Sequence, residues 1–495
     1  IDAEQAGGLA ETRVRRLLLV LLGAAILFHV VIFLHTALAY VEFPYEQKSV
    51  VEGVTVYNAA KYLDGETSYR DPTAAPFRSM VYPPVHEMLL APVMGVLGAP
   101  SLIAGRIVSL LCALGTAAMA GAAIQRRTRN WRAATLGGLF FLCGYGLSLQ
   151  WIEQVRNDAL LCLLIVAGLL ASERAIARKR FPAAGLALLI LALYTKQTAL
   201  FAALAVIATL WRNDRRRALV WAGSYAGAAL LIFLLMQWWS DGWFAFYILR
   251  VPAGVGFNLV QLNHAVTFFV MTLPATGFAL WHSLLTVKHP GDGESPLWGT
   301  AFLIGLPVCL LQSVKWGATM NAFLPLLPLI GVIGAIGLHR RLSAKPSGRY
   351  GCLLLALALL QVGMLVYRPL LPDASHFESH RRIATWVRAA PGPVLVSGCS
   401  SHAYKNGKAY YGDPVIMGDL QRAGLWRGNE AIAMTRRGKF ALLVLRPKVE
   451  PADLAAAVKA RYVPIERIHF DNSIGGWPWM QVYVPASAPW QPSPD

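Results

Sequence analysis

Apolar residues occur along this chain in long runs separated by short polar connections. Eleven such runs cover residues 17–39, 101–124, 133–150, 159–177, 182–195, 197–211, 218–238, 264–286, 297–313, 322–338 and 350–367. Runs of about 18 or more apolar residues are typical of helices that cross a lipid bilayer. The pattern predicts a polytopic α-helical membrane protein with about eleven transmembrane helices, of which the fifth and sixth are short and closely joined.

Basic residues are concentrated on alternate connections between these runs. The clusters are Arg13/Arg15/Arg16, Arg126/Arg127/Arg129/Arg132, Arg174/Arg178/Lys179/Arg180, Arg212/Arg215/Arg216/Arg217 and Arg340/Arg341/Lys345/Arg349, and Lys288 adds a weaker one. Short cytoplasmic loops of membrane proteins carry an excess of lysine and arginine. We therefore expect residues 1–16 in the cytoplasm and, after eleven spans, the C-terminal region on the opposite side.

The apolar stretch 85–97 is too short for a further span. Its 13 residues would form about 20 Å of helix, whereas the bilayer core is about 30 Å thick. Counting it as a span would also invert every later loop and break the alternation of charge. We expect an interfacial helix on the outer surface, introduced by the Tyr-Pro-Pro sequence at 82–84, within one long external loop over residues 40–100.

Residues 368–495 have a different pattern from the rest of the chain. Strand-like runs at 393–398, 440–447 and 479–486 alternate with helical patterns at 376–390 and 451–461. This alternation predicts a small C-terminal α/β domain outside the cytoplasm. The proline-rich tail, residues 487–495, is expected to be disordered.

The composition supports a membrane protein and argues against nucleic-acid binding. The chain is 56% hydrophobic and 15% charged, whereas a soluble domain has about 25% charged residues. Much of the net charge of +18 lies in the short connections, where basic residues set topology. The six cysteines include no CxxC pair and mostly lie in apolar runs, so we expect neither a zinc site nor a disulfide framework.

Polar residues that topology does not explain gather on the predicted external side. They are Glu46, Glu52, Tyr82, His86, Arg156, Asp158, Lys196, Gln197, Arg250, Lys315 and Asn321. Each has an ordinary alternative: Lys196 and Lys315 could be snorkelling anchors, and Asp158 could cap the helix that begins near it. Together they combine a base with cations beside lipid, which suits a substrate with a phosphate head and an apolar tail.

Six motifs carry a family resemblance along residues 17–367. They are VEGVTVYNAAKYLDGETSYRDP at 51–72, YPPV at 82–85, GRIVSLL at 105–111, WIEQVRNDALL at 151–161, LALYTKQTAL at 191–200 and KWGATMNAFLPLLPL at 315–329. In this order they resemble the GT-C superfamily of membrane glycosyltransferases, particularly the branch of aminoarabinose transferase and the protein O-mannosyltransferases.

The resemblance implies transfer of a sugar from a polyprenyl-phosphate donor to an acceptor on the external side. The acidic residue of the family's first external loop maps to Glu52. The family often has an acidic pair there, but this chain has Val51 before Glu52, so Glu46 is an alternative base. The second acidic position maps to Asp158. Aminoarabinose enzymes carry a lysine where this chain has Tyr82.

The implied reaction is a single inverting displacement. The acceptor hydroxyl would attack with help from Glu52 or Glu46, while Asp158 orients the acceptor or a cation. The donor phosphate would be held by Lys196, Lys315, Arg156 and Arg250, and the other candidate substrate contacts are Gln197, Asn321, Tyr82 and His86. A divalent ion at Glu52 and Asp158 is compatible with these carboxylates, but no ligand spacing requires one.

Two other activities remain open at this point. One is an O-antigen ligase or polymerase that uses a polyprenyl-diphosphate donor. The other is a lipid-linked sugar transporter or flippase, which would favour charges at the bilayer midplane and broken helices in repeated halves. For the transferase we expect membrane lipid and an envelope glycan, lipid or protein acceptor as partners, no nucleic acid, and a location in the bacterial inner membrane.

Overall fold

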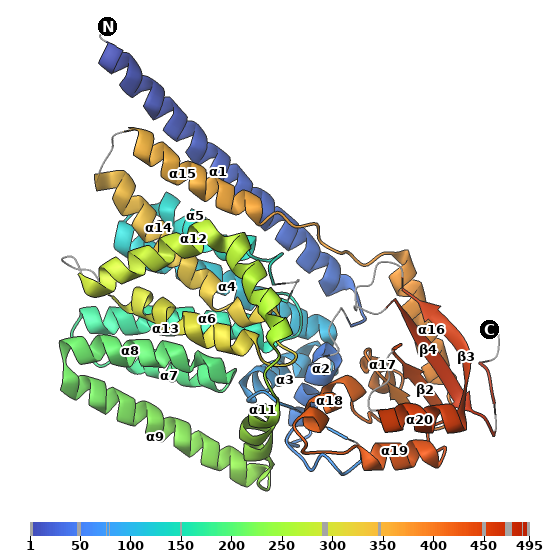
Figure 1. Cartoon of the computed structure of the whole chain (residues 1–495). Coiled ribbons are helices and arrows are strands. Elements are labelled where there is room, and N and C mark those ends of the chain that lie inside the picture. The colour runs from blue at the N-terminus through green and yellow to red at the C-terminus, as the bar shows by residue number, and fades with distance from the viewer. Residues whose placement is uncertain are drawn as a thin grey trace.

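A helical bundle forms most of the molecule in the computed structural model (Figure 1). The structure describes residues 3–46, 51–75, 77–78, 80–148, 151–289, 296–344, 348–447, 452–470, 478–487 and 489–492. Each predicted span coincides with one helix: α1 (Ala3–Glu42), α4 (Leu102–Thr128), α5 (Trp131–Cys143), α6 (Asn157–Ala177), α7 (Ala183–Leu193), α8 (Leu200–Asn213), α9 (Arg215–Trp239), α12 (Leu262–Lys288), α13 (Leu297–Ser313), α14 (Leu326–Ala344) and α15 (Gly348–Met364).

Six of these helices, in the part of the chain that the structure describes, are long and apolar enough to cross a membrane. They are α1, α4, α6, α9, α12 and α14. The helices α5, α7, α13 and α15 are apolar but shorter. A multi-pass membrane protein is therefore supported, while the count of eleven spans stays a prediction. Among the long helices α6 is the most enclosed, and α9 lies exposed along one edge of the bundle (Figure 1).

The third span ends earlier than the sequence pattern predicts. Helix α5 stops at Cys143, and residues 144–148 form buried turns instead of continuing to residue 150. Within these turns Gly146 lies against Tyr367, since a Cβ there would lie 2.3 Å from the Cβ of Tyr367. The chain thus turns where it passes directly against another segment.

The connections that carry the basic clusters meet at one end of the bundle. Glu173 of α6 accepts hydrogen bonds from Arg127 of α4 (2.6 Å to Nη2) and from the indole of Trp298 in α13 (2.9 Å). Arg212, at the end of α8, donates to the carbonyl of Val287 near the end of α12 (2.6 Å). These contacts bring together four of the connections predicted to be cytoplasmic. The intervening connections lie at the other end.

Two short helices of the first long loop pack at this other end. Helix α2 (Val51–Leu63) lies against α3 (Val85–Leu97), which has a buried face containing Leu90 and Met94 and an exposed face that includes Val96. This amphipathic burial fits a helix at a membrane surface. The backbone N–H of Val85 donates to the carbonyl of Tyr194 (3.0 Å), which ties the start of α3 to the connection after α7.

Helix α12 contains Pro274, which cannot donate a backbone hydrogen bond. One turn of this helix is bridged by Gln361 of α15. The side-chain oxygen of Gln361 accepts from the N–H of Ala275 (3.0 Å), and its nitrogen donates to the carbonyl of Met271 (2.9 Å). These two backbone groups would normally bond each other in an α-helix, so the glutamine amide is inserted into the helical hydrogen-bond ladder.

The C-terminal part contains the predicted alternation of strands and helices. Its elements are α16 (Ala374–Ala389), β1 (Val394–Val396), α17 (Ser401–Lys405), α18 (Pro414–Arg422), α19 (Asn429–Arg436), β2 (Leu442–Leu445), α20 (Ala452–Arg461), β3 (Tyr462–His469) and β4 (Trp479–Pro485). The strand order is β1-β2-β4-β3; β1 and β2 are parallel, and β4 is antiparallel to both of its neighbours. Figure 1 shows the sheet beside one end of the helical bundle.

Besides the short helices α17, α18 and α19, which the pattern did not indicate, two features of this part differ from the sequence prediction. Strand β3 is absent from the prediction, because it is a half-exposed edge strand that carries Glu466 and Arg467 and has no apolar run. Within the tail expected to be disordered, Trp490 packs against Trp386, with 5.5 Å between ring centroids, and donates to the carbonyl of Ala441 (3.0 Å). This part of the tail is therefore held against the sheet.

Candidate active site

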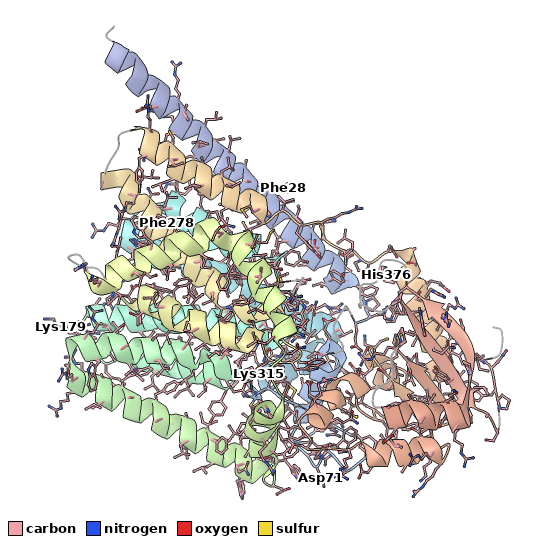
Figure 2. All side chains as sticks on the ribbon, in the orientation of Figure 1. Phe28, Asp71, Lys179, Phe278, Lys315 and His376 are labelled. Atoms are coloured by element: carbon pink, nitrogen blue, oxygen red, sulfur yellow. The ribbon has the colours of Figure 1, made fainter. Side chains whose placement is uncertain are left out.

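The candidate residues lie at the end of the bundle opposite the basic connections. Figure 2 shows Lys315 at the end that faces the C-terminal part, whereas Lys179 lies at the far end. Residues 151–156, between α5 and α6, form an irregular connection that is almost entirely buried. Two polar clusters border this connection, and we name them the Asp158 cluster and the Arg106 cluster.

In the Asp158 cluster, three side chains converge on one carboxylate. Lys196 donates through Nζ to Asp158 Oδ1 (2.8 Å), and Arg156 donates through Nε to Oδ2 (3.2 Å). Asn321 lies 3.4 Å from both carboxylate oxygens through Nδ2. The connection before α6, the tip before α8 and the segment before α14 thus supply one group each. Asp158 binds these side chains, so the capping alternative does not describe its contacts.

These groups are removed from solvent. Asp158 is 1% exposed and Lys196 is 3% exposed, so Lys196 is not a snorkelling anchor in this structure. Although burial acts to lower the pKa of Lys196, the neighbouring Asp158 outweighs it and the pKa is raised. Two aromatic faces complete the cluster: Tyr82 lies 5.6 Å from Lys196 Nζ, and Trp151 lies 3.6 Å from Arg156 Cζ.

His86, in the first turn of α3, is fully buried close to this cluster. Burial lowers its pKa to about 4; the charge of Asp158 opposes that shift and the charge of Arg156 adds to it. The imidazole is therefore neutral near pH 7. Neither ring nitrogen has a hydrogen-bond partner among the described residues. A buried polar group without a partner is uncommon in native proteins, which makes His86 a candidate contact for a polar ligand.

In the Arg106 cluster, a guanidinium of α4 holds Glu52 in a bidentate ion pair. Arg106 Nε lies 3.0 Å from Glu52 Oε1 and Nη2 lies 2.9 Å from Oε2, and both side chains are 0% exposed. Arg106 also donates to the carbonyls of Tyr40 (2.7 Å), Phe43 (2.5 Å) and Tyr45 (2.6 Å). Arg106 lies in the GRIVSLL motif at 105–111, whose sequence context indicated no role for it. Its one signal was a lone arginine inside an apolar run.

Glu46 lies next to Glu52 but has different partners. It accepts from the backbone N–H of Gly53 (3.1 Å) and from that of Ser401 in the C-terminal part (2.6 Å). Burial raises the pKa of Glu46 to about 8, although the bonds from Ser401 act to lower it. Glu46 is therefore mostly protonated near pH 7. Residue 53 must be small here, because a Cβ on Gly53 would lie 2.4 Å from Glu46 Oε1.

The connection 151–156 joins the two clusters. The backbone N–H of Val155 donates to Glu52 Oε1 (3.0 Å), and Asp158 follows three residues later. The structure thus brings Glu46, Glu52 and Asp158 to one region, together with Arg156, Lys196, Asn321, Tyr82 and His86.

Three other candidates, Lys315, Gln197 and Arg250, contact or belong to a neighbouring segment and do not bind Asp158. This segment contains the π-helix η2 (Phe246–Arg250) and α11 (Val251–Gly254). Lys315 donates to the carbonyl of Pro252 (2.6 Å), and Gln197 donates to that of Ile248 (3.4 Å). Arg250 is exposed, with its guanidinium 5.9 Å from the Phe246 ring. Because Gln197 adjoins Lys196, this segment borders the Asp158 cluster.

The two carboxylates do not fit a divalent ion in this arrangement. Glu52 is neutralised by Arg106, and Asp158 by Lys196 and Arg156. Throughout the described ranges, no group of three or more His, Cys, Asp or Glu side chains could hold a metal ion.

The C-terminal part contacts the Arg106 cluster through aromatic and histidine side chains. The ring of Tyr45 stacks on those of His380 (4.6 Å) and His402 (5.3 Å), and the two imidazoles approach to 2.9 Å between Nδ1 and Nε2. Tyr404 donates its hydroxyl to the carbonyl of Gly53 (3.2 Å). His402 therefore takes part in the contact between the C-terminal part and the Arg106 cluster.

Known proteins resemble this chain in fold. No protein-family model and no curated protein sequence matches it. Among solved structures, ArnT from Cupriavidus metallidurans bound to undecaprenyl phosphate is similar with a TM-score of 0.57 at 15% identity, covering 93% of this chain and 99% of ArnT. The apo oligosaccharyltransferase of Archaeoglobus fulgidus gives 0.55 at 13% identity, covering 90% and 73%. Archaeal AglB from that organism, in complex with an inhibitory peptide and a dolichol-phosphate, gives 0.52 at 12% identity, covering 88% and 72%.

Proposed function

This chain has the GT-C fold of membrane glycosyltransferases, and on that premise we propose that it transfers a sugar from a polyprenyl-phosphate donor to an acceptor hydroxyl. Two proteins of similar fold have been solved with a polyprenyl-type phosphate, undecaprenyl phosphate in ArnT and dolichol-phosphate in AglB. The observation that carries the proposal here is the Asp158 cluster, which gathers cations at one end of a membrane bundle.

The Asp158 cluster suits a phosphate monoester. Asp158 holds the ammonium of Lys196 and the guanidinium of Arg156 close together in a buried setting, where charges interact more strongly than in water. Phosphate oxygens accept charge-assisted hydrogen bonds from such groups. The neutral, unpartnered imidazole of His86 is suited to a sugar hydroxyl, and Asn321 and Tyr82 contact the same cluster.

The reaction is one displacement at the anomeric carbon. The acceptor oxygen forms a bond to this carbon while the bond from the carbon to the phosphate oxygen breaks, so the configuration inverts. The bonding electron pair leaves with the polyprenyl phosphate, and the acceptor proton passes to a carboxylate. Lys196 and Arg156 stabilise the charge that the leaving phosphate gains, and Lys315, Arg250 and Gln197 extend this surface along the neighbouring segment.

Glu52 is the better base of the two candidates. Arg106 favours its ionised form, which is the form that accepts a proton, whereas Glu46 is mostly protonated near pH 7 because burial raises its pKa to about 8. To take the acceptor proton, one oxygen of Glu52 leaves Arg106 during turnover. Glu46 then fixes the C-terminal part beside the base.

We place this reaction on the extracytoplasmic face of a bacterial inner membrane. The positive-inside rule puts the basic end of the bundle in the cytoplasm, so the Asp158 cluster and the C-terminal part lie outside it. An acceptor on this side is an envelope glycan, lipid or protein.

The test is donor cleavage by the purified chain. With candidate hydroxyl acceptors supplied, we expect release of free polyprenyl phosphate from a synthetic polyprenyl-phosphate sugar, and about 10²–10³-fold slower release in Lys196→Gln and Asp158→Asn because the leaving charge loses its fixed partners. Glu173→Gln is the matched control, since Glu173 is also buried and paired with an arginine, at the opposite end. Wild-type rates in both site variants would refute the proposal, and a donor that crosses liposomes unchanged would indicate transport instead.

A further inference from the structure

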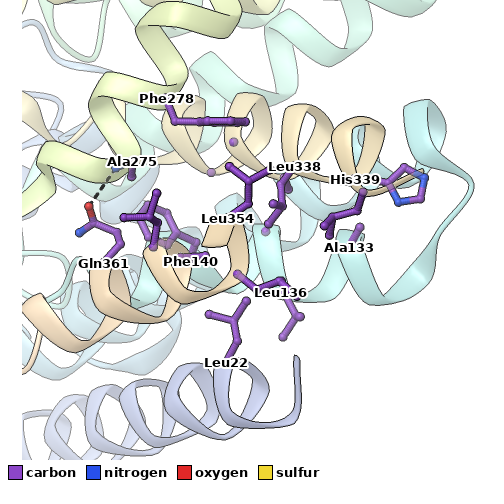
Figure 3. Close-up of a pocket in the computed structure, with 18 of the residues that line it drawn as sticks. Leu22, Ala133, Leu136, Phe140, Ala275, Phe278, Leu338, His339, Leu354 and Gln361 are labelled. Carbon is purple, nitrogen blue, oxygen red and sulfur yellow. Dashed lines mark hydrogen bonds between the residues drawn. The ribbon is translucent and has the colours of Figure 1, made fainter. Parts of the chain in front are cut away.

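A cavity of about 360 Å³ lies between α1, α5, α12, α14 and α15. It does not adjoin either polar cluster described above. Its walls are mainly apolar and include Leu22, Leu136, Phe140, Phe278, Leu338 and Leu354. In Figure 3 the side chains of Phe278 and Leu22 face the space from opposite sides, and Gln361 and His339 lie towards its two ends.

The two ends of the cavity differ in polarity. At one end, both amide atoms of Gln361 are bonded to the backbone of α12. At the other end the lining includes Arg15, Arg132 and His339, which belong to the connections with basic clusters. No acidic side chain is among the described residues that line the cavity. The cavity is therefore apolar along its walls and basic at one end.

Small residues of α14 leave the cavity unfilled. Gly331, Gly334 and Ala335 of α14 line it, and a Cβ added at Gly334 would meet no atom within 4 Å. In another protein, an engineered apolar cavity of about 150 Å³ stays dry and binds benzene. This cavity is more than twice as large, so it has room for a longer hydrocarbon group.

We propose that this cavity binds an acyl chain of an anionic phospholipid, with the lipid phosphate held by Arg15 and Arg132 beside His339. Basic pockets between transmembrane helices on the cytoplasmic side suit anionic lipid headgroups, and the bilayer supplies such lipids at this depth. A polyprenyl tail fits the charges less well, because its phosphate would lie at the Asp158 cluster and leave Arg15 and Arg132 without an anion. The site does not rest on the proposed sugar transfer.

The test measures which lipid stays bound to the full chain. The protein is placed in nanodiscs with equal amounts of palmitoyl-oleoyl phosphatidylglycerol and phosphatidylethanolamine, released into mild detergent, and weighed by native mass spectrometry. Two basic residues, each contributing a factor of about 5, predict a preference for phosphatidylglycerol of roughly 25-fold. Arg15→Gln combined with Arg132→Gln should remove this preference.

A cavity-filling variant tests the acyl-chain site itself. Gly334→Leu should abolish the retained lipid, whereas Gly227→Leu, on the exposed face of α9 where a Cβ also meets nothing within 4 Å, should retain it. Equal retention of the two phospholipids by the wild type, full retention by Gly334→Leu, or recovery of polyprenyl phosphate as the bound species would each overturn the proposal. If Gly334→Leu does not fold, the arginine variant decides the outcome.

Discussion

Arg106 and Glu52 form a buried pair whose loss can be followed as a change in folding free energy. Both side chains are 0% exposed, and both oxygens of Glu52 accept hydrogen bonds: Oε1 from Arg106 Nε and Val155 N–H, Oε2 from Arg106 Nη2. Glutamine has one acceptor oxygen, so Glu52→Gln points an amide N–H₂ at a donor and leaves the guanidinium uncompensated. Breaking a buried pair in this way costs about 3–5 kcal/mol.

A double-mutant cycle separates the pair from its surroundings. The variants are Glu52→Gln, Arg106→Met and the combination, and the free energy of unfolding is measured by denaturant titration in detergent micelles. Because each single variant strands the other partner, we expect the double variant to cost less than the sum of the singles by about 0.5–3 kcal/mol. Additive losses, or single variants within about 0.5 kcal/mol of wild type, would refute the reasoning. Unchanged stability with lost turnover would assign the charge of Glu52 to chemistry alone.

Two further predictions concern contacts outside this pair. The fold raises the pKa of Glu46 from 4.5 to about 8, so the folded state binds the proton more tightly and the free energy of unfolding should fall between about pH 4.5 and pH 8. Glu46→Gln should reduce the difference between the unfolding free energies measured by denaturant titration at pH 5 and at pH 8. An unchanged difference would contradict this. Gln361→Leu should lower the free energy of unfolding by about 1–3 kcal/mol, because it leaves buried backbone groups of α12 without partners. Gln237→Leu, which loses similar backbone bonds at a more exposed site, should cost less. Equal shifts in melting temperature for the two variants would argue against the insertion of the Gln361 amide into α12.

The helices were predictable because a membrane span needs about 20 consecutive apolar residues. That requirement made each run visible without knowledge of its neighbours, and the alternation of charge then assigned the connections to two ends. For the same reason Asp158, Lys196 and Asn321 could be placed at one end. The sequence could not show that these three side chains are in contact while Lys315 contacts Pro252 instead. Residues at the same end of the bundle share a depth along its axis, but the sequence does not tell where each helix lies around that axis.

Arg106 shows what the apolar pattern conceals. The last carbonyls of a helix have no partner within it, and at the C-terminal end of α1 Arg106 donates to the carbonyl of Tyr40 and to those of Phe43 and Tyr45 just beyond. An arginine near a helix C-terminus is also favoured by the helix dipole. Because its partners are backbone atoms and a carboxylate far away in the chain, no local spacing marked this role.

The contact between Glu46 and Ser401 joins residues 355 positions apart, so it too was invisible in the sequence, yet it bears directly on access to the site. A protonated Glu46 gives this contact the character of a neutral hydrogen bond, which contributes about 0.5–1.5 kcal/mol. Ionisation near pH 8 would leave a buried charge beside Glu52, whose negative charge already raises the pKa of Glu46. The hydrogen bond from Ser401 acts to lower this pKa, so it favours the ionised form, and the loss of stability at high pH comes from burying the charge and not from weakening this contact. The aromatic stack of Tyr45 on His380 adds to the attachment of the C-terminal part.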